Sequence, residues 1–412
     1  MEDRETYVVV GANLAGGRAA EGLRAAGFDG RILLIGAEPE PPYERPALSK
    51  EILKGTMEPE QLLLKQADAW ESDGVELVLD TRVTRIRPSE RSLELDSGAT
   101  VRADKILLST GGRVRRLTMP GAELEGVRYL RTLEDALAIR EHLRPDAPVV
   151  VVGAGFVGAE VAASARQLGA RVTVLEAAEV PLQRALGERM GRLYARYHRE
   201  RGIDLRTGVS VERFEGDRRV RGVVTSGGER FDAECVVVGV GIEPATELAE
   251  QAGIATGNGI LVDEYGRTSL ENVYAAGDVA CFPHAIIGGR VRLESWQNAQ
   301  NQAVNTARTM LGERTPFVEV PWFWSDQFDL NLQMAGDTSA ADDIVVRGST
   351  EAARFSAFYL REGVLTGVLG VNRPRDVRAA MKHIHSGVRL DPAQLTDEQV
   401  DIRKLGVRAG SA

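Results

Sequence analysis

Cysteine is nearly absent from this chain of 412 residues, which has only Cys235 and Cys281. The two lie far apart and among apolar residues, which excludes a disulfide framework and a cysteine-based metal site. Cys281 is expected to be buried packing rather than a nucleophile. His383 and His385 are two positions apart, so they point to different sides of a helix. We therefore expect no metal site.

Long hydrophobic runs are also missing. No apolar run reaches the roughly 18 residues that a membrane span needs. The N-terminus is acidic and leads straight into a strand-like segment, so we expect no signal peptide. These features predict a cytoplasmic globular protein with no membrane contact.

Positive charge is outweighed by negative charge, since 51 Lys and Arg face 60 Asp and Glu for a net charge of −9. This balance argues against nucleic acid as the main partner. At about 150 residues per domain, the length predicts two or three domains. Glycine, in contrast, is abundant at 44 residues, above the usual share of about 7%. Its clusters point to the function.

The first glycine cluster follows a short apolar run at residues 6–10. Gly11 and Gly16 open a turn into an Ala-rich helix, and a second apolar run then ends near Glu38. In such a βαβ unit the turn and the helix N-terminus bind a pyrophosphate, and the acid binds a ribose hydroxyl. Asn13 replaces the usual middle glycine. Taken alone, this turn fits a structural role equally well.

The same pattern recurs after the apolar run at residues 148–152. Gly153, Gly155 and Gly158 form an unbroken G-x-G-x-x-G, and Glu176 ends the next predicted strand. Two such units in one chain predict two dinucleotides, most simply FAD and a nicotinamide.

Three other predicted strands end in glycine. Gly111 follows one, where the chain can leave the first domain, and Gly239 and Gly241 follow another, where it can return. The third ends at Gly277 and Asp278. A carboxylate at that position can accept hydrogen bonds from the ribityl hydroxyls of a flavin.

The stretch Pro42–Lys50 reads P-Y-E-R-P-A-L-S-K and contains no cysteine. Disulfide reductases hold their redox-active pair in this region. Four more motifs follow in order, at Tyr129–Asp135, Glu294–Ala299, Val320–Gln327 and Asn372–Pro374. Together these residues resemble the putidaredoxin reductase-like ferredoxin reductases, which serve cytochromes P450 and Rieske dioxygenases. That family belongs to the two-dinucleotide-binding flavoproteins of glutathione reductase type.

The resemblance implies an α/β fold with two Rossmann-like domains that bind FAD and NAD(P), and a C-terminal α+β domain. The FAD domain is expected to be discontinuous, at 1–112 and 243–314. The NADH domain would lie between, at 113–242, and the C-terminal domain at 315–412. Two strands of the last domain are expected at 343–347 and 353–361.

The cofactor contacts that the resemblance implies fall into two sets. For FAD they are Gly11, Asn13, Ala15, Gly16, Glu38, Arg45, Lys50, Val83, Thr110, Gly111, Arg131, Gly277, Asp278, Glu294 and Trp296. For NADH they are Gly153, Gly155, Gly158, Glu160, Glu176, Gly239 and Gly241. A carboxylate at Glu176 binds the free 2′-hydroxyl of NADH and repels the 2′-phosphate of NADPH. We therefore predict NADH.

Three residues are implied to act in the reaction. Lys50 would lie near flavin N5 and stabilise the anionic reduced ring, and Glu160, in the first turn of its helix, would pair with Lys50. Trp324 is the candidate for the electron route or docking edge, with Trp322 in the core. The alternative is that both indoles merely pack the C-terminal domain.

The implied partner is a ferredoxin, expected to hold a [2Fe–2S] cluster, with a cytochrome P450 or Rieske oxygenase downstream. Small ferredoxins are generally acidic, so this negatively charged chain needs a local basic patch. Arg373, Arg375, Arg378 and Lys382 are the predicted patch near Trp324, although a solvated helix face explains them equally well. We expect the reductase to be a monomer.

Three other functions compete with this prediction. An NADH oxidase or peroxidase would need a reactive cysteine near the flavin, and residues 40–50 have none. A rubredoxin reductase differs only in its acceptor. An NADH-responsive flavoprotein similar to apoptosis-inducing factor is disfavoured by the basic patch and by the expected absence of a targeting segment.

Overall fold

The computed structural model describes residues 4–339 and 341–406, which form two compact units. The first unit consists of the described residues up to Glu44, Glu60–Arg113 and Glu243–Pro321, and the second of Arg45–Pro59, Val114–Ile242 and the described residues from Trp322 onward. Two of the passages between the units lie within β8 (Gly112–Val114) and β17 (Ile242–Pro244). The finer division into three domains stays a prediction.

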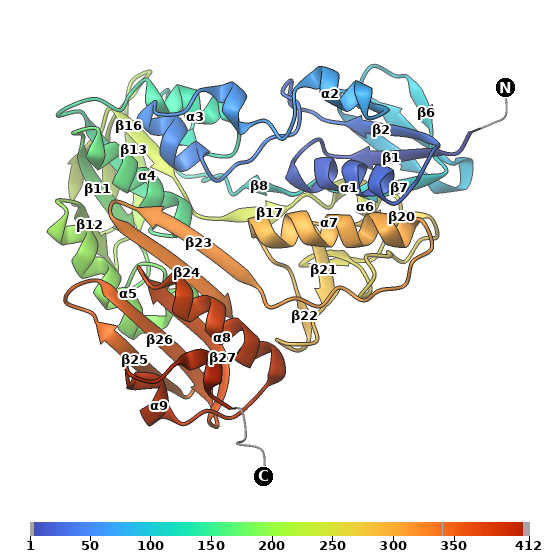
Figure 1. The fold of residues 1–412 in the computed structure, drawn as a ribbon. Coiled ribbons are helices and arrows are strands. Elements are labelled where there is room, and N and C mark those ends of the chain that lie inside the picture. The colour runs from blue at the N-terminus through green and yellow to red at the C-terminus, as the bar shows by residue number, and fades with distance from the viewer. Residues whose placement is uncertain (1–3, 340, 407–412) are drawn as a thin grey trace, which may run out of the picture. The chain divides into compact units, whose positions relative to one another are not determined.

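A parallel five-stranded sheet organises the first unit, in the order β20-β7-β1-β2-β3 (Figure 1). Tyr7 and Val9 face one side of the sheet, Val8 and Val10 face the other, and all four are buried. Burial on both sides explains the continuous apolar sequence of such strands. The strands are β1 (Thr6–Val10), β2 (Arg31–Ile35), β3 (Val75–Val78), β7 (Lys105–Leu108) and β20 (Val273–Ala275).

Two helices, α1 (Leu14–Ala25) and α7 (Trp296–Met310), lie side by side on the Tyr7 face of this sheet (Figure 1). A Cβ on Gly22 would lie 3.2 Å from the Cβ of Ala307, so a glycine allows the close approach of the helices. The unit also contains β4 (Val83–Arg87), β5 (Ser92–Leu95), β6 (Thr100–Arg102), β18 (Thr256–Gly257), β19 (Gly259–Leu261), β21 (Ala280–Pro283), β22 (Arg290–Val291), α2 (Ala67–Ser72) and α6 (Glu247–Gln251).

A second parallel sheet has the order β12-β11-β10-β16-β9 and lies in the second unit. It repeats the β-turn-α-β arrangement of the first, as the recurring glycine pattern predicts. Its strands are β9 (Val127–Tyr129), β10 (Pro148–Val152), β11 (Arg171–Glu176), β12 (Asp204–Thr207) and β16 (Cys235–Val238). Around it lie η1 (Leu48–Ile52), α3 (Leu133–Arg140), α4 (Phe156–Gln167), α5 (Gln183–Glu200), β13 (Val211–Gly216), β14 (Val220–Thr225) and β15 (Arg230–Asp232).

The C-terminal part of the second unit is an antiparallel sheet, in the order β23-β24-β27-β26-β25. Helix α8 (Pro374–Ser386) packs against β24 and β27 (Figure 1). The strands are β23 (Trp322–Gln327), β24 (Leu330–Gly336), β25 (Asp343–Ser349), β26 (Arg354–Arg361) and β27 (Val364–Val371). The predicted strands at 343–347 and 353–361 are confirmed as β25 and β26, and the predicted fold class is confirmed with them.

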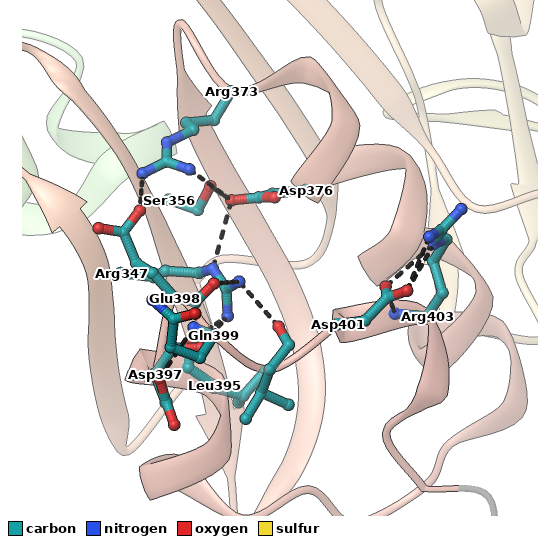
Figure 2. Close-up of polar contacts among 11 residues, drawn as sticks. Arg347, Ser356, Arg373, Asp376, Leu395, Asp397, Glu398, Gln399, Asp401 and Arg403 are labelled. Carbon is teal, nitrogen blue, oxygen red and sulfur yellow. Dashed lines mark hydrogen bonds and ion pairs between the residues drawn. The ribbon is translucent and has the colours of Figure 1, made fainter.

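The last described segment, with α9 (Pro392–Thr396) and η4 (Ile402–Lys404), is held by the buried Arg347 of β25 (Figure 2). The guanidinium donates to the carbonyl oxygens of Leu395, Asp397, Glu398 and Val400 at 2.7–3.3 Å. Its Nε lies 3.8 Å from Asp376 Oδ2. One cation therefore satisfies four backbone acceptors that would otherwise be costly to bury.

Both cysteines are buried and free, as expected of packing residues. His383 is buried, with Nε2 2.7 Å from the Ile402 carbonyl, whereas His385 is exposed. Within residues 4–339 and 341–406, no helix is long and apolar enough to cross a membrane.

Candidate active site

The first glycine-rich turn joins β1 to α1. A Cβ on Gly11 would lie 2.4 Å from the Ser109 carbonyl oxygen, and one on Gly16 would lie 1.9 Å from the Gly11 carbonyl oxygen. Asn13 has an extended backbone with φ −122°, so this position needs no glycine. Its amide donates to the Ser109 carbonyl at 2.6 Å and accepts from the Gly16 N–H at 3.2 Å. Asn13 therefore caps α1 and preserves the turn.

Glu38 follows β2 and is oriented by Tyr43. The phenol of Tyr43 is buried and donates to Glu38 Oε2 at 2.5 Å. This contact places an acceptor beyond the carboxyl end of the strand, where a ribose hydroxyl would bind. It also explains the tyrosine of the P-Y-E-R-P stretch, a role that the sequence did not reveal.

The Gly277–Asp278 turn lies beside the first glycine-rich turn. A Cβ on Gly277 would lie 3.0 Å from the Cβ of Ala15. The Gly277 N–H donates to Oε1 of the buried Gln302 at 2.9 Å. Gln302 belongs to α7, so this helix fixes the Gly-Asp turn next to α1.

The other FAD residues expected in the first unit are also placed. Thr110 donates to the Ala245 carbonyl at 2.8 Å, and Gly111 accepts from the Ala245 N–H at 3.0 Å. Glu294 pairs with Arg292 at 2.6 Å. Val83, which begins β4, is buried, and Trp296 begins α7.

The second glycine-rich turn lies between β10 and α4, and its three glycines differ in how closely the surrounding atoms pack against them. A Cβ on Gly153 would lie 2.5 Å from the Gly239 carbonyl oxygen, and one on Gly158 would lie 2.1 Å from the Gly153 carbonyl oxygen. A Cβ on Gly155 would meet only the Gly239 oxygen, at 4.0 Å. Packing thus requires the first and third glycines, while the second leaves space open at the start of α4. That space fits a pyrophosphate.

Glu176 ends β11 with its carboxylate turned toward this turn. Oε2 accepts the Ala154 N–H at 2.6 Å, and Oε1 accepts the Ala178 N–H at 2.8 Å. A carboxylate has about four acceptor sites, so it can still accept ribose hydroxyls. The residues present therefore fit an adenine dinucleotide with a free 2′-hydroxyl.

Lys50 is a buried cation of the second unit. It lies in η1, is only 6% exposed, and has its Nζ 3.7 Å from Glu160 Oε1 and 3.8 Å from Asp326 Oδ2. The same Nζ lies 5.5 Å from the centre of the Trp324 ring, within cation–π range. The predicted pair of Lys50 and Glu160 is present in the structure, and Lys50 is not a solvated lysine.

Glu160 is buried, and two hydroxyls donate to it. Ser49 donates to Oε2 at 2.5 Å and Ser325 donates to Oε1 at 2.6 Å. Burial raises the pKa of Glu160, while Lys50 and the two hydroxyls oppose that rise. The prediction that Glu160 lies in the first helical turn is wrong, because α4 begins at Phe156 and places Glu160 one turn further along.

Trp322 and Trp324 lie on one side of β23, because alternate residues of a strand share a face. Their rings stack with centroids 5.1 Å apart at 19°. Trp322 is half-buried and donates to Gln333 Oε1 at 3.4 Å. The prediction that Trp322 is a core residue is therefore wrong, since Ser325 and Gln327 occupy the buried positions of this strand.

Comparison with known proteins places the chain in a family. Residues 5–303 match the pyridine nucleotide-disulphide oxidoreductase model, and residues 322–406 match the reductase C-terminal model. The chain belongs to the pyridine nucleotide-disulphide oxidoreductase family. The resemblance predicted from the sequence is confirmed, and the chain is an oxidoreductase that uses FAD and NADH.

Individual relatives match almost the whole length. Rhodocoxin reductase of Rhodococcus erythropolis is 42% identical over 97% of this chain and 93% of that protein. The ferredoxin reductase component of chlorobenzene dioxygenase from Cupriavidus sp. (strain PS12) is 39% identical over 97% of both chains. The structure of a covalent putidaredoxin reductase–putidaredoxin complex aligns with a TM-score of 0.94, at 37% identity over 97% of both chains.

Two more residues that the resemblance assigns to FAD, Arg45 and Arg131, lie in the second unit with Lys50. Arg45 donates to the Arg131 carbonyl at 2.5 Å. The Arg131 N–H donates to Asp135, which forms a capping box with Thr132 at the start of α3. The Tyr129–Asp135 motif thus fixes the backbone that Arg45 contacts.

The predicted basic patch needs one correction. Arg373 is half-buried, lies 3.9 Å from Asp376, and forms an ion pair with Glu398 (Figure 2). Its charge is therefore neutralised within the fold. Arg375, Arg378 and Lys382 are exposed on α8.

Proposed function

We propose that this oxidoreductase is an NADH-dependent ferredoxin reductase that passes electrons singly to a [2Fe–2S] ferredoxin serving a cytochrome P450 or Rieske-type oxygenase. The observation that carries the proposal is the buried Lys50–Glu160 pair beneath Trp324, in a chain whose 42–50 stretch has no cysteine. Relatives named as reductases of rhodocoxin and of dioxygenase systems support it.

When bound, NADH and FAD would supply the redox chemistry of hydride transfer and single-electron transfer. The chain supplies binding, orientation and charge. The open space at Gly155 admits a pyrophosphate, and Glu176 favours a free 2′-hydroxyl over a phosphate. Lys50 holds a positive charge in a buried position, where charge interacts more strongly than in water.

Glu160 sets how much of that positive charge is available. As a carboxylate it compensates Lys50 and keeps the ammonium in place at 3.7 Å. A buried cation without this partner would carry a large desolvation penalty. Asp326 contributes a second, exposed carboxylate at 3.8 Å.

The proposed docking surface combines Trp324 with the exposed cations of α8. Arg375, Arg378 and Lys382 are three or four residues apart and therefore share one side of the helix. An acidic ferredoxin would be attracted to this face although the whole chain carries −9. Arg373 is left out because Asp376 and Glu398 already neutralise it.

An anaerobic titration of the purified holoenzyme with NADH, followed by visible absorbance, tests the function. Rapid bleaching of the flavin by one equivalent, and reoxidation by a [2Fe–2S] ferredoxin, are the expected results. Slow bleaching would contradict the proposal and favour the NADH-responsive flavoprotein. Reoxidation by a rubredoxin but not by a ferredoxin would show that the protein is a rubredoxin reductase instead.

The proposal also covers the cellular location and the oligomeric state. We place a monomeric protein in the cytoplasm, and the two free thiols support a reducing compartment. Cell fractionation and light scattering of the purified protein test the two points separately.

A further inference from the structure

A chain of buried hydrogen bonds leads from Glu160 to His198. Ser325 Oγ lies 2.6 Å from Glu160 Oε1, Gln327 Nε2 lies 2.9 Å from Ser325 Oγ, and His198 Nε2 lies 2.7 Å from Gln327 Oε1. Ser325, Gln327 and His198 are each no more than 3% exposed. Glu160 belongs to α4, His198 to α5, and Ser325 and Gln327 to β23.

The hydrogen bonds between His198 and Glu160 all run in one direction, with each donor on the His198 side. Gln327 gives its amide N–H to Ser325, so its carbonyl oxygen faces His198 and needs a donor there. Burial lowers the pKa of His198 to about 4, so the ring is neutral and carries a single N–H. That N–H must lie on Nε2. Ser325 accepts from Gln327 and is left with one hydrogen, which points to Glu160.

We propose that Gln327 and His198 are positioning residues that orient the Ser325 hydroxyl toward Glu160 and so keep this carboxylate charged beside Lys50. The oriented hydroxyl stabilises the ionised form of Glu160 but not the neutral one. His198 never contacts Glu160 and acts through two intervening side chains.

The direction of these hydrogen bonds can reverse. If the His198 proton moved to Nδ1, Nε2 would become an acceptor and the Gln327 amide would turn its N–H toward it. The Gln327 oxygen would then face Ser325 and take the hydroxyl hydrogen away from Glu160. Glu160 would keep only the Ser49 hydroxyl and would bind a proton more readily.

The other charged and titratable groups around the chain do not replace this donor. Lys50 of η1 and Asp326 of β23 face Glu160 with opposite charges. Tyr194 of α5 is buried, and burial together with the Glu160 charge raises the pKa of its phenol well above the usual value. Arg201 lies near His198 and further disfavours a charged imidazole.

Infrared difference spectroscopy of the holoenzyme during a pH titration tests the inference, with the Glu160 carboxylic-acid band identified by its loss in Glu160→Gln. We expect His198→Phe to increase the protonated fraction of Glu160 at a given pH by about tenfold, the effect of one charge-assisted hydrogen bond. The ring shape is kept between Tyr194 and Phe328, which contact His198.

Two serine backgrounds provide the matched control. Ser325→Ala and Ser49→Ala each remove one hydroxyl that donates to Glu160, but only Ser325 belongs to the chain of hydrogen bonds that leads to His198. His198→Phe should have no further effect on Glu160 in Ser325→Ala and its full effect in Ser49→Ala. An equal effect in both backgrounds, or none in the parent protein, would overturn the proposal. If His198→Phe does not fold, Gln327→Met is tested in the same way.

The inference rests on the proposed function only in giving the charge of Glu160 a role in flavin reduction. The two parts fail differently. A His198→Phe effect that Ser325→Ala abolishes establishes the positioning chain even if Lys50→Met leaves the rate of flavin reduction unchanged. An unchanged Glu160 band in a protein that reduces ferredoxin rapidly would remove the positioning chain and keep the function.

Discussion

The carboxylate of Glu176 accepts the backbone N–H of Ala154 at 2.6 Å, which ties the end of β11 to the glycine-rich turn after β10. The residue proposed to select the ribose thus also holds the turn proposed to bind the pyrophosphate. Ala154 immediately precedes Gly155, so this hydrogen bond holds the proposed pyrophosphate site in shape before any ligand binds. A preorganised site loses less entropy on binding.

Gly155→Ala should weaken NADH binding by about tenfold or more without lowering stability. Its backbone, with φ −73°, suits any residue, and the new methyl group would occupy only the space left for the pyrophosphate. Isothermal titration with NAD⁺ and thermal unfolding measure the two effects. Gly158→Ala is the control and should unfold the turn, because its Cβ would lie 2.1 Å from the Gly153 carbonyl oxygen. Equal stability losses in both variants would refute the distinction.

Lys50→Met should slow the reduction of flavin by NADH about tenfold or more, because the buried positive charge beside Glu160 is lost. Anaerobic stopped-flow absorbance measures the rate. Lys404→Met removes an exposed lysine and should leave it unchanged. An unaltered rate in Lys50→Met would remove this residue from the reaction.

The sequence predicted the parts of this site that are local in the chain. Glycine spacing and the strand pattern predicted both βαβ turns and their acids, whereas the Lys50–Glu160 pair joins residues far apart in the chain and was predicted only from the family resemblance. Ser325, Gln327 and His198 were missed as a set. His198 and Gln327 are 129 residues apart, so only the packing of α5 against β23 brings them together.

The C-terminal sheet shows the same limit. Strands β25 and β26 have clear apolar patterns and were predicted, whereas β24 and β27 were not. Glycines at Gly336, Gly367 and Gly370 interrupt the pattern of these two strands. At Gly370 a Cβ would lie 2.5 Å from Val377 Cγ2 of α8, so this glycine serves helix packing rather than a turn.

Arg378→Glu should raise the KM for ferredoxin several-fold at low ionic strength, because it reverses one charge on the exposed face of α8. Steady-state reduction of ferredoxin over a range of salt concentrations measures it. The difference from the parent protein should shrink as salt screens the charges. A KM that does not depend on salt in either protein would exclude this docking surface.

The free energy of unfolding should fall as the pH is lowered, because His198 binds a proton less readily in the folded protein than in the unfolded chain. Its pKa is about 4 in the folded protein, against an ordinary value of 6.5, so the unfolded chain binds the proton first as the pH falls. Between these values the free energy of unfolding should decrease by about 1.4 kcal/mol per pH unit. Urea unfolding at pH 7 and pH 5 measures the change, and His198→Phe should lose less stability than the parent protein. Parallel losses in the two would contradict the assignment.

Arg347→Leu should lower the free energy of unfolding of the C-terminal sheet by about 3–5 kcal/mol, the usual cost of breaking a buried charged network. The change would leave four carbonyl oxygens between Leu395 and Val400 without their donor, and would leave Asp376 with Arg373 and Ser356 (Figure 2). Hydrogen exchange should therefore rise first in residues 391–402.

Arg403→Ala is the matched control for this prediction. Arg403 pairs with Asp401 at 2.7 Å in a separate contact of the same segment (Figure 2), but its guanidinium is exposed. Exposed ion pairs contribute little because water screens them. The unfolding midpoint of Arg403→Ala should match that of the parent protein. If both variants lost the same stability, burial of Arg347 would not be what holds the segment.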